Sequence, residues 1–320
     1  MFDTLIKNGR VVLADREETL DIGIRDGRIA ALAPNIDTAC AREMVDASGQ
    51  YVMPGMVDAH MHVSEPGRTE WEGYETGTQA MVAGGITSFV EMPLNTIPAT
   101  TNVETLELKL RTAEGKCWAD YAPMGGLVPW NLDDLAPLAD AGVAAFKAFV
   151  ATCGSGKPGD FKNVTDFELY EGCRRIAQKD GLLVVHCKNA TITDGLGKAA
   201  RAAGLTKLSD YVASRPIFTE VEAVHRVLLI AEAAAFTSHT ALAPRWSRRS
   251  SGLRFAALTR ASSPAHTISC SALKSLTLSV RRPNVHLRFA TAVIRKFYGR
   301  CSPMMRSKCS SPTILRAPST

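Results

Sequence analysis

A chain of 320 residues with 46% hydrophobic side chains is long and apolar enough to bury one large core or two modest ones, which excludes a disordered protein. The N-terminus has no basic segment followed by an apolar stretch, and no run reaches the roughly 18 apolar residues of a membrane span. We therefore expect a cytoplasmic protein with no membrane partner. The eight cysteines are dispersed without a CxxC pair, which argues against a disulfide framework and against a cysteine zinc site.

The formal net charge of +5 hides an uneven distribution. The segment 236–320 holds 15 of the 37 Lys and Arg residues and none of the 32 Asp and Glu residues, so residues 1–235 carry a net charge of −10. A basic, acid-free segment is typical of a disordered tail or of an arm that binds nucleic acid or another acidic partner. The abrupt change near Ala235 needs an explanation of its own.

The first fifty residues contain short apolar runs separated by the turn dipeptides Asn8-Gly9 and Asp26-Gly27. Short alternating runs with such turns predict antiparallel β hairpins. From Tyr51 onward the pattern changes to strand-length and helix-length segments in alternation. After residue 235 this alternation stops.

The alternating region predicts a parallel sheet covered by helices, either open or closed into a barrel, because its strands are apolar on both faces. The expected strands are residues 52–59, 86–92, 121–128, 143–150 and 182–187, and the expected helices are residues 74–83, 103–114, 132–139, 166–178, 192–203 and 219–235. Polar residues gather just past the strand ends, which is where a (β/α)8 barrel builds its active site.

His60 and His62 stand at the end of the first expected strand of this region. Because side chains alternate along a strand, both imidazoles point to one face and can converge on one metal ion, while Met61 points back into the packing. Two half-buried histidines bonded to backbone would show the same pattern. A metal site therefore requires further ligands elsewhere in the chain.

Lys147 and His186 are the further candidates. Lys147 lies in an apolar strand, where an isolated ammonium is costly to bury, so it is expected to be paired, deprotonated or covalently modified. The sequence alone favours a pair with a carboxylate such as Glu91; a deprotonated amine could instead add carbon dioxide and bridge two metal ions as a carbamate. His186 ends another expected strand, and imidazoles with an oxygen donor suit zinc, iron or manganese. His225 is predicted to lie on a helix surface.

Several long motifs resemble, in order, the allantoinase branch of the cyclic amidohydrolases over residues 1 to about 235. They are HMHVSEPGR at 60–68, WEGYETGT at 71–78, EMPLN at 91–95, FKAFVATCG at 146–154, VHC at 185–187 and DYVASRP at 210–216. The resemblance implies a (β/α)8 barrel with a small β domain formed by both chain ends. Residues 1–50 would be the N-terminal part of that domain, and residues 51–235 the first five to six β/α units of the barrel.

The resemblance also implies a binuclear metal centre with two divalent ions, expected to be zinc. By position, His60 and His62 would bind the first metal, Lys147 as its carbamate would bridge the two, and His186 would bind the second. The implied reaction opens the hydantoin ring of allantoin to give allantoate in purine catabolism. It is physically sound because bound metal lowers the pKa of water to roughly 7 and polarises a carbonyl.

Other implications of the resemblance concern the substrate and the assembly. Asn95, Cys153 and Gly154 stand past strand ends and would contact a small-molecule substrate, allantoin. Lys188 departs from the glutamate that relatives commonly carry after His-Cys, which places a cation in the outer shell of the second metal. The assembly implied for a folded chain is a homotetramer, with no nucleic acid as partner.

The general base that this family requires is missing from the chain. The family needs a histidine after the sixth strand and an aspartate after the eighth, which serves as ligand and base, but no Asp or Glu follows Glu232. A barrel that lacks strands also leaves an open sheet edge and an unclosed core. We therefore expect the chain as it stands to be inactive, with its catalytic base unknown.

A change of reading frame close to Ala235 would explain the missing acids and the irregular pattern together. Read one base earlier, the codons for residues 238–247 can encode IAHCSSPEMV, and those for residues 311–318 can encode VSDHSPCT. Both strings resemble the missing ligand segments, histidine and aspartate included. On this hypothesis 236–320 is a frameshifted tail without a native fold, and the nucleotide sequence across the codons for residues 233–240 decides the matter.

Two other functions stay open. A dihydropyrimidinase or hydantoinase would share the metal centre and the ring chemistry but differ in its substrate loops. A non-catalytic protein could keep the amidohydrolase fold for protein interaction, although the retained His60, His62, Lys147 and His186 argue against a long-standing loss of metal chemistry. A nucleic-acid-binding arm at 236–320 is the weakest of the alternatives, because a frame change accounts for its composition.

Overall fold

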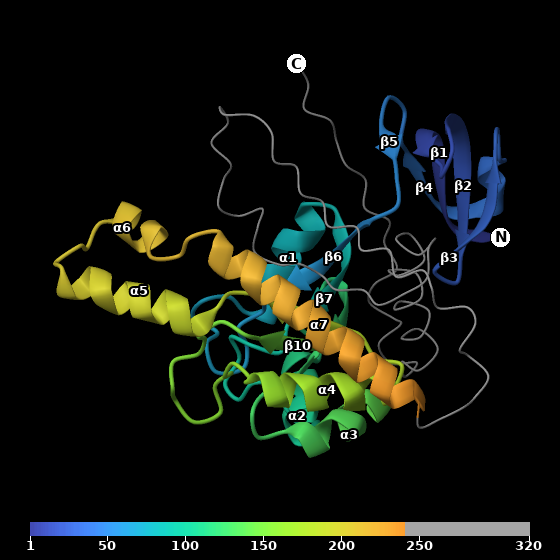
Figure 1. Cartoon of the computed structure of the whole chain (residues 1–320). Coiled ribbons are helices and arrows are strands. Elements are labelled where there is room, and N and C mark those ends of the chain that lie inside the picture. The colour runs from blue at the N-terminus through green and yellow to red at the C-terminus, as the bar shows by residue number, and fades with distance from the viewer. Residues whose placement is uncertain (241–320) are drawn as a thin grey trace.

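The computed structural model describes residues 1–240, with side chains described as far as residue 234 (Figure 1). Residues 241–320 lie outside the described part. Most of the expected basic segment 236–320 therefore lies outside the described part. The hypothesis of a changed reading frame close to Ala235 concerns the same residues.

The N-terminal region forms a small five-stranded sheet. Its strands are β1 (Phe2–Val12), β2 (Glu17–Arg25), β3 (Arg28–Ala33), β4 (Ala41–Asp46) and β5 (Tyr51–Val52), in the order β3-β2-β1-β4 with β5 also paired to β1. The pairs β1–β2 and β2–β3 are antiparallel, as the hairpin prediction requires, whereas β4 and β5 run parallel to β1. The sheet has an apolar core of its own, made by Ile6, Val11, Leu20, Ile22, Ile24, Ala47 and Val52.

The turn predicted at Asn8-Gly9 is wrong. These residues lie inside β1, where the register with β2 shifts between Ile6 and Gly9 and Asn8 has a φ of 61°. This is a β-bulge, a feature that uses the same left-handed backbone tolerance as a turn. The Asn8 side chain also donates to Asp46 at 3.0 Å. Asp26-Gly27, in contrast, forms the predicted turn between β2 and β3.

The second region is built on parallel strands whose neighbours follow chain order. These are β6 (Met56–Met61), β7 (Ile86–Glu91) and β8 (Asp120–Pro123), then β9 (Gly125–Gly126), β10 (Phe146–Phe149) and β11 (Leu183–His186). Only Met124 separates β8 from β9, so the expected strand 121–128 is interrupted there. The expected strand 52–59 is divided at Pro54-Gly55, and its first part, β5, belongs to the small sheet.

Sequential parallel pairing is the progression of a barrel rather than of a doubly wound sheet, in which the strand order reverses. Within residues 1–240 the strands do not close: β6 pairs with β7 alone and β11 with β10 alone. The described fold is therefore α/β with parallel strands, and the closed (β/α)8 barrel stays a prediction.

Helices follow the strands in the chain; several pack beside the strands, whereas the helices between residues 190 and 213 extend away from them (Figure 1). They are α1 (Tyr74–Ala83), α2 (Val103–Ala113), α3 (Leu135–Asp140, after a 3-10 turn at Leu132–Asp134), α4 (Asp166–Gln178), α5 (Ala190–Ala202), α6 (Leu208–Ala213) and α7 (Phe218–Thr240). The predicted bounds of α1 and α4 are confirmed, α6 was not predicted, and α7 continues past the predicted end at residue 235. None of the helices in the described part is both long and apolar enough to cross a membrane.

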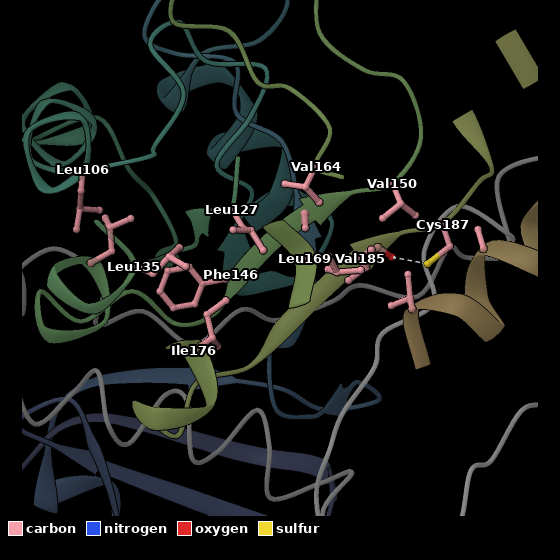
Figure 2. Packing of buried hydrophobic residues seen from close by; sticks show 14 residues of the cluster. Leu106, Leu127, Leu135, Phe146, Val150, Val164, Leu169, Ile176, Val185 and Cys187 are labelled. Atoms are coloured by element: carbon pink, nitrogen blue, oxygen red, sulfur yellow. Dashed lines mark hydrogen bonds between the residues drawn. The ribbon is translucent and has the colours of Figure 1, made fainter. Parts of the chain in front are cut away.

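Side-chain alternation along β10 sorts its residues between two cores. Phe146 and Ala148 pack with Leu135 of α3, Leu169 of α4 and other apolar residues of these helices and α7 (Figure 2). Phe149 packs on the other side, with the cluster that contains Met92, Phe161 and Val184. Because the period of a strand is two, Lys147 shares the face of Phe149 and points away from the helices.

A buried ion pair joins the first two helices to the sheet. Lys109 of α2 contacts the Glu91 carboxylate of β7 at 2.8 Å and donates to the Met92 carbonyl at 3.0 Å, and the Tyr74 hydroxyl of α1 donates to the same Glu91 oxygen at 3.0 Å. The side chains of Lys109 and Glu91 are 1% and 0% exposed. Removal of one partner would leave the other charge buried and unpaired.

We expect Lys109→Met to lower the free energy of unfolding by about 3–5 kcal/mol, because it strands the Glu91 carboxylate. The double variant Glu91→Leu/Lys109→Met should recover much of this loss. Arg111→Met, which breaks the exposed pair with Glu107 on the same helix, serves as the matched control and should cost no more than about 1 kcal/mol. Urea unfolding measures all three, and equal losses in Lys109→Met and Arg111→Met would contradict the assignment.

Candidate metal centre

The two histidines of the first strand lie side by side. His60 belongs to β6 and His62 follows it, with ring centroids 5.3 Å apart. Met61, between them, packs outward with Val63 and Phe89, as the predicted alternation requires. Both imidazoles therefore face the side of the sheet that the helices leave open.

Burial keeps both imidazoles neutral. Desolvation, with the nearby His60 as the next cause, lowers the pKa of His62 to about 4. Desolvation and then the charge of Lys147 lower the pKa of His60 below its ordinary value. A neutral imidazole has a free lone pair, which is the form that binds a metal ion.

Lys147 is fully buried, and among the described residues its Nζ has no hydrogen-bond partner. Desolvation lowers its pKa to about 8. The pairing with Glu91 that the sequence favours is wrong, because Glu91 faces α1 and α2 and is bonded to Tyr74 and Lys109. A lysine amine of this kind is available for covalent modification.

His186 joins the same face from the next strand. Lys147 is in register with Val184 and Phe149 with His186, so His186 stands two positions beyond Lys147 toward the carboxyl end of the strands. Its ring stacks on Phe149 with centroids 4.8 Å apart and an angle of 16° between the planes. His225, by contrast, is exposed on α7, as predicted.

The expected substrate residues surround this face. Asn95 has a φ of 68°, and its Nδ2 lies 3.4 Å from Nδ1 of His62. Cys153 is close enough for the charge of Lys147 to act on it, and burial raises the pKa of its thiol to about 12. Gly154 has a φ of 80°, and a Cβ there would lie 2.0 Å from the carbonyl oxygen of Phe161, so this turn requires glycine.

The donor set fits a metal centre in part. Imidazoles and a carboxylated lysine are suitable ligands by type, and the charge of Lys147 acts on both His60 and His62, while His186 lies on β11, which pairs with β10. Within residues 1–234, however, no cluster of three or more His, Cys, Asp and Glu side chains could hold a metal ion by itself. The role of His60, His62, Lys147 and His186 as metal ligands therefore stays a prediction.

Sequence reasoning missed the pair of Arg68 and Asp160. Arg68 Nη2 contacts Asp160 Oδ2 at 2.8 Å, and the two side chains are 13% and 4% exposed. Arg68 stands in a motif and could have been flagged as a charge next to the paired histidines. Asp160 lies in an irregular loop with no periodic signal, and only the tertiary fold brings it to Arg68.

Comparison with known proteins identifies the family. Residues 51–261 match the Amidohydrolase family over about two thirds of the chain. This chain belongs to the amidohydrolases. The resemblance inferred from the motifs is confirmed.

Two groups of relatives resemble this amidohydrolase. Curated allantoinases of Salmonella choleraesuis and Salmonella paratyphi B are each 52% identical over 239 residues, which is 74% of this chain and 52% of the relative. The solved L-hydantoinase (dihydropyrimidinase) from Arthrobacter aurescens is 37% identical with a TM-score of 0.67, over 73% of this chain and 51% of that one. A D-hydantoinase from Thermus sp. is 27% identical with a TM-score of 0.62, over 72% and 50%. The chain spans about half the length of these relatives.

The Asp160 carboxyl gives a pH dependence to the stability of this amidohydrolase. Burial alone would raise the pKa of Asp160, but donors from Arg68, Ser155 and Phe161 together hold it well below its usual range. A carboxyl with a depressed folded pKa stabilises the fold above its unfolded pKa, about 4, and loses that contribution as the pH falls toward the folded value.

We therefore expect wild type to exceed Asp160→Asn in free energy of unfolding by the largest margin above about pH 5, with the margin shrinking below about pH 4. Arg68→Met should remove much of this pH dependence, because it removes a principal donor to the carboxylate. Urea unfolding over a pH series measures the effect. A margin that stays constant from pH 6 to pH 3 would contradict it.

Proposed function

We propose that this chain carries the N-terminal half of the active site of an allantoinase-type amidohydrolase, which opens the hydantoin ring of allantoin to allantoate. The observation that carries the proposal is the buried Lys147 amine, which has no hydrogen-bond partner among the described residues and lies close enough to His60 and His62 for its charge to lower the pKa of both. The 52% identity to Salmonella allantoinases supports allantoin as the substrate. A (β/α)8 barrel, a homotetramer and a small β domain at residues 1–50 belong to the same proposal.

Two divalent ions, proposed to be zinc, would occupy this centre. His60 and His62 would hold the first, the carbamate of Lys147 would bridge both, and His186 would hold the second. When bound, such ions lower the pKa of a water molecule and polarise the ring carbonyl. The imidazoles contribute by being neutral and prepositioned, so that no proton has to leave them when a metal binds.

Carbamate formation follows from the state of Lys147. The lowered pKa leaves part of the amine neutral near pH 8, and its lone pair can attack the carbon of CO2. A nitrogen–carbon bond forms, one C=O π pair moves to oxygen, and the nitrogen releases a proton to solvent. The product is an anionic group whose oxygens could bind metal ions, and bound cations would compensate the cost of burying its charge.

The surrounding side chains would position the ring. The Asn95 amide is a neutral donor and acceptor next to His62, and the Cys153 thiol stays protonated at neutral pH because of its raised pKa. Neither can replace the missing base. The family aspartate has no counterpart among the residues after Glu232, so catalysis by the chain as it stands is not expected.

A hydantoinase or dihydropyrimidinase is the second candidate. The Arthrobacter aurescens L-hydantoinase (dihydropyrimidinase) covers 73% of the chain, against 74% for the allantoinase of Salmonella choleraesuis, but its identity is 37% against 52%. The two candidates share the ligands and differ in the ring that the loops accept.

Two measurements test the proposal. In the purified chain with bicarbonate, calorimetric titration should show zinc binding below two ions per chain that is lost in His60→Ala and Lys147→Ala. His225→Ala, an exposed histidine outside the centre, is the control and should bind as wild type does. Zinc binding unaffected by Lys147→Ala would contradict the assignment of the bridge.

Turnover separates the candidates. The chain as it stands should not hydrolyse allantoin, whereas a chain with residues after 235 read in the earlier frame should hydrolyse allantoin in preference to dihydrouracil. Lys147→Ala in that restored chain should lower the rate by at least about a hundredfold, because metal activation is worth several kcal/mol. Preference for dihydrouracil would favour the hydantoinase alternative, and robust turnover by the unrestored chain would show that the missing ligands are not needed.

A further inference from the structure

Three loops meet where β6, β7 and β10 end. The first loop (62–73) carries His62, the second (92–102) carries Asn95, and the third (150–165) carries Cys153 and Gly154. The candidate metal ligands and the candidate substrate residues therefore sit on separate loops. Their mutual geometry depends on whatever holds these loops together.

Arg68 of the first loop contacts both of the others. Its Nη2 contacts Asp160 of the third loop at 2.8 Å, and its Nη1 donates to the Asn95 carbonyl of the second loop at 3.0 Å. The guanidinium also lies over the Trp71 ring, 4.9 Å from the centroid. A planar fork of donors can make these contacts at once, which a lysine ammonium cannot do in the same geometry.

Asp160, held by Arg68, also bonds to the backbone next to the turn at Cys153 and Gly154. Its carboxylate accepts from the backbone N–H of Ser155 at 2.7 Å and from the N–H of Phe161 at 2.8 Å. Gly154 lies so close to Phe161 that a Cβ at Gly154 would be 2.0 Å from the Phe161 carbonyl oxygen. The carboxylate thus joins Phe161 to Ser155, the residue that directly follows Cys153 and Gly154.

Asn95 links Arg68 to His62, one of the candidate metal ligands. With its carbonyl held by Arg68, its side-chain amide lies 3.4 Å from Nδ1 of His62. Two backbone hydrogen bonds support the arrangement: Ile97 N–H donates to the Pro66 carbonyl at 3.0 Å, and Ala99 N–H donates to the Gly159 carbonyl at 2.8 Å. These bonds join the second loop to the first and to the third.

We propose that the Arg68–Asp160 ion pair is a positioning device that couples the three loops, holding Asn95 against His62 on one side and the segment that follows Cys153 and Gly154 on the other. The inference rests on the proposed function, because it assumes that His62 binds a metal ion and that the turn at Cys153 and Gly154 contacts the substrate. One ion pair would then determine the position of both. An ion pair with a role in the third loop alone would stabilise that loop and leave the other two unchanged.

Hydrogen exchange of the full chain, read by mass spectrometry, tests the coupling without any need for activity. Arg68→Lys keeps the charge and loses the fork, and Asp160→Asn keeps the shape and loses the charge. Each should speed exchange by about tenfold or more in peptides from all three loops, since each removes charge-assisted bonds. Peptides from β1 and β2 should exchange as in wild type. The control Arg174→Lys, whose partner Glu171 is on the same helix, should leave all three loops unchanged.

Cobalt(II) absorption of the same variants reports the ligand geometry at His62, which a purely structural role would not alter. Arg68→Lys should shift or weaken the visible Co2+ band, and Arg174→Lys should keep the wild-type band. Faster exchange confined to the substituted loop, or an unchanged band in Arg68→Lys, would overturn the proposal. If wild type fails to bind Co2+, the proposed function is contradicted, and the exchange pattern still decides whether the loops are coupled.

Discussion

The burial of the Lys147 amine is the constraint on which the rest of the site depends. Its Nζ has no hydrogen-bond partner among the described residues and lies 5.1 Å from the centroid of the Phe149 ring, and desolvation lowers its pKa to about 8. Side chains along β10 alternate between its two faces. Phe146 and Ala148 pack against the helices on one face, so Lys147 lies on the other face, toward His60 and His62. The apolar packing of the strand and the chemistry of the site are thus two consequences of one alternation.

Charge compensation elsewhere keeps Lys147 in this state. The one buried carboxylate near the end of β7, Glu91, is already engaged by Lys109 and Tyr74 on the helix side. Lys109 on α2 pairs with Glu91, whereas Lys147 on β10 has no hydrogen-bond partner among the described residues, so only the first of these two buried lysines forms an ion pair there.

The sequence predicts features that depend on residues close together in the chain, and it does not predict those that depend on contacts between distant residues. The convergence of His60 and His62 depends only on strand alternation, and the bounds of α1 and α4 depend on local periodicity, so both were accessible from the sequence. The partner of Glu91 could not be chosen, because the faces of β7 and β10 are fixed by packing between distant elements. Asn8-Gly9 has the same backbone tolerance in a bulge as in a turn. Asp160 lies 92 positions after Arg68 in the chain, and no local sequence pattern at either residue predicts the contact between them.

The most direct test of the account is a crystal structure of the chain grown with zinc and bicarbonate, with anomalous data collected at the zinc edge. We predict a zinc peak about 2 Å from an imidazole nitrogen of both His60 and His62, and a carboxyl group on the Nζ of Lys147 that contacts the zinc. An unmodified Lys147 bonded to a protein side chain, with no zinc at the two histidines, would contradict it.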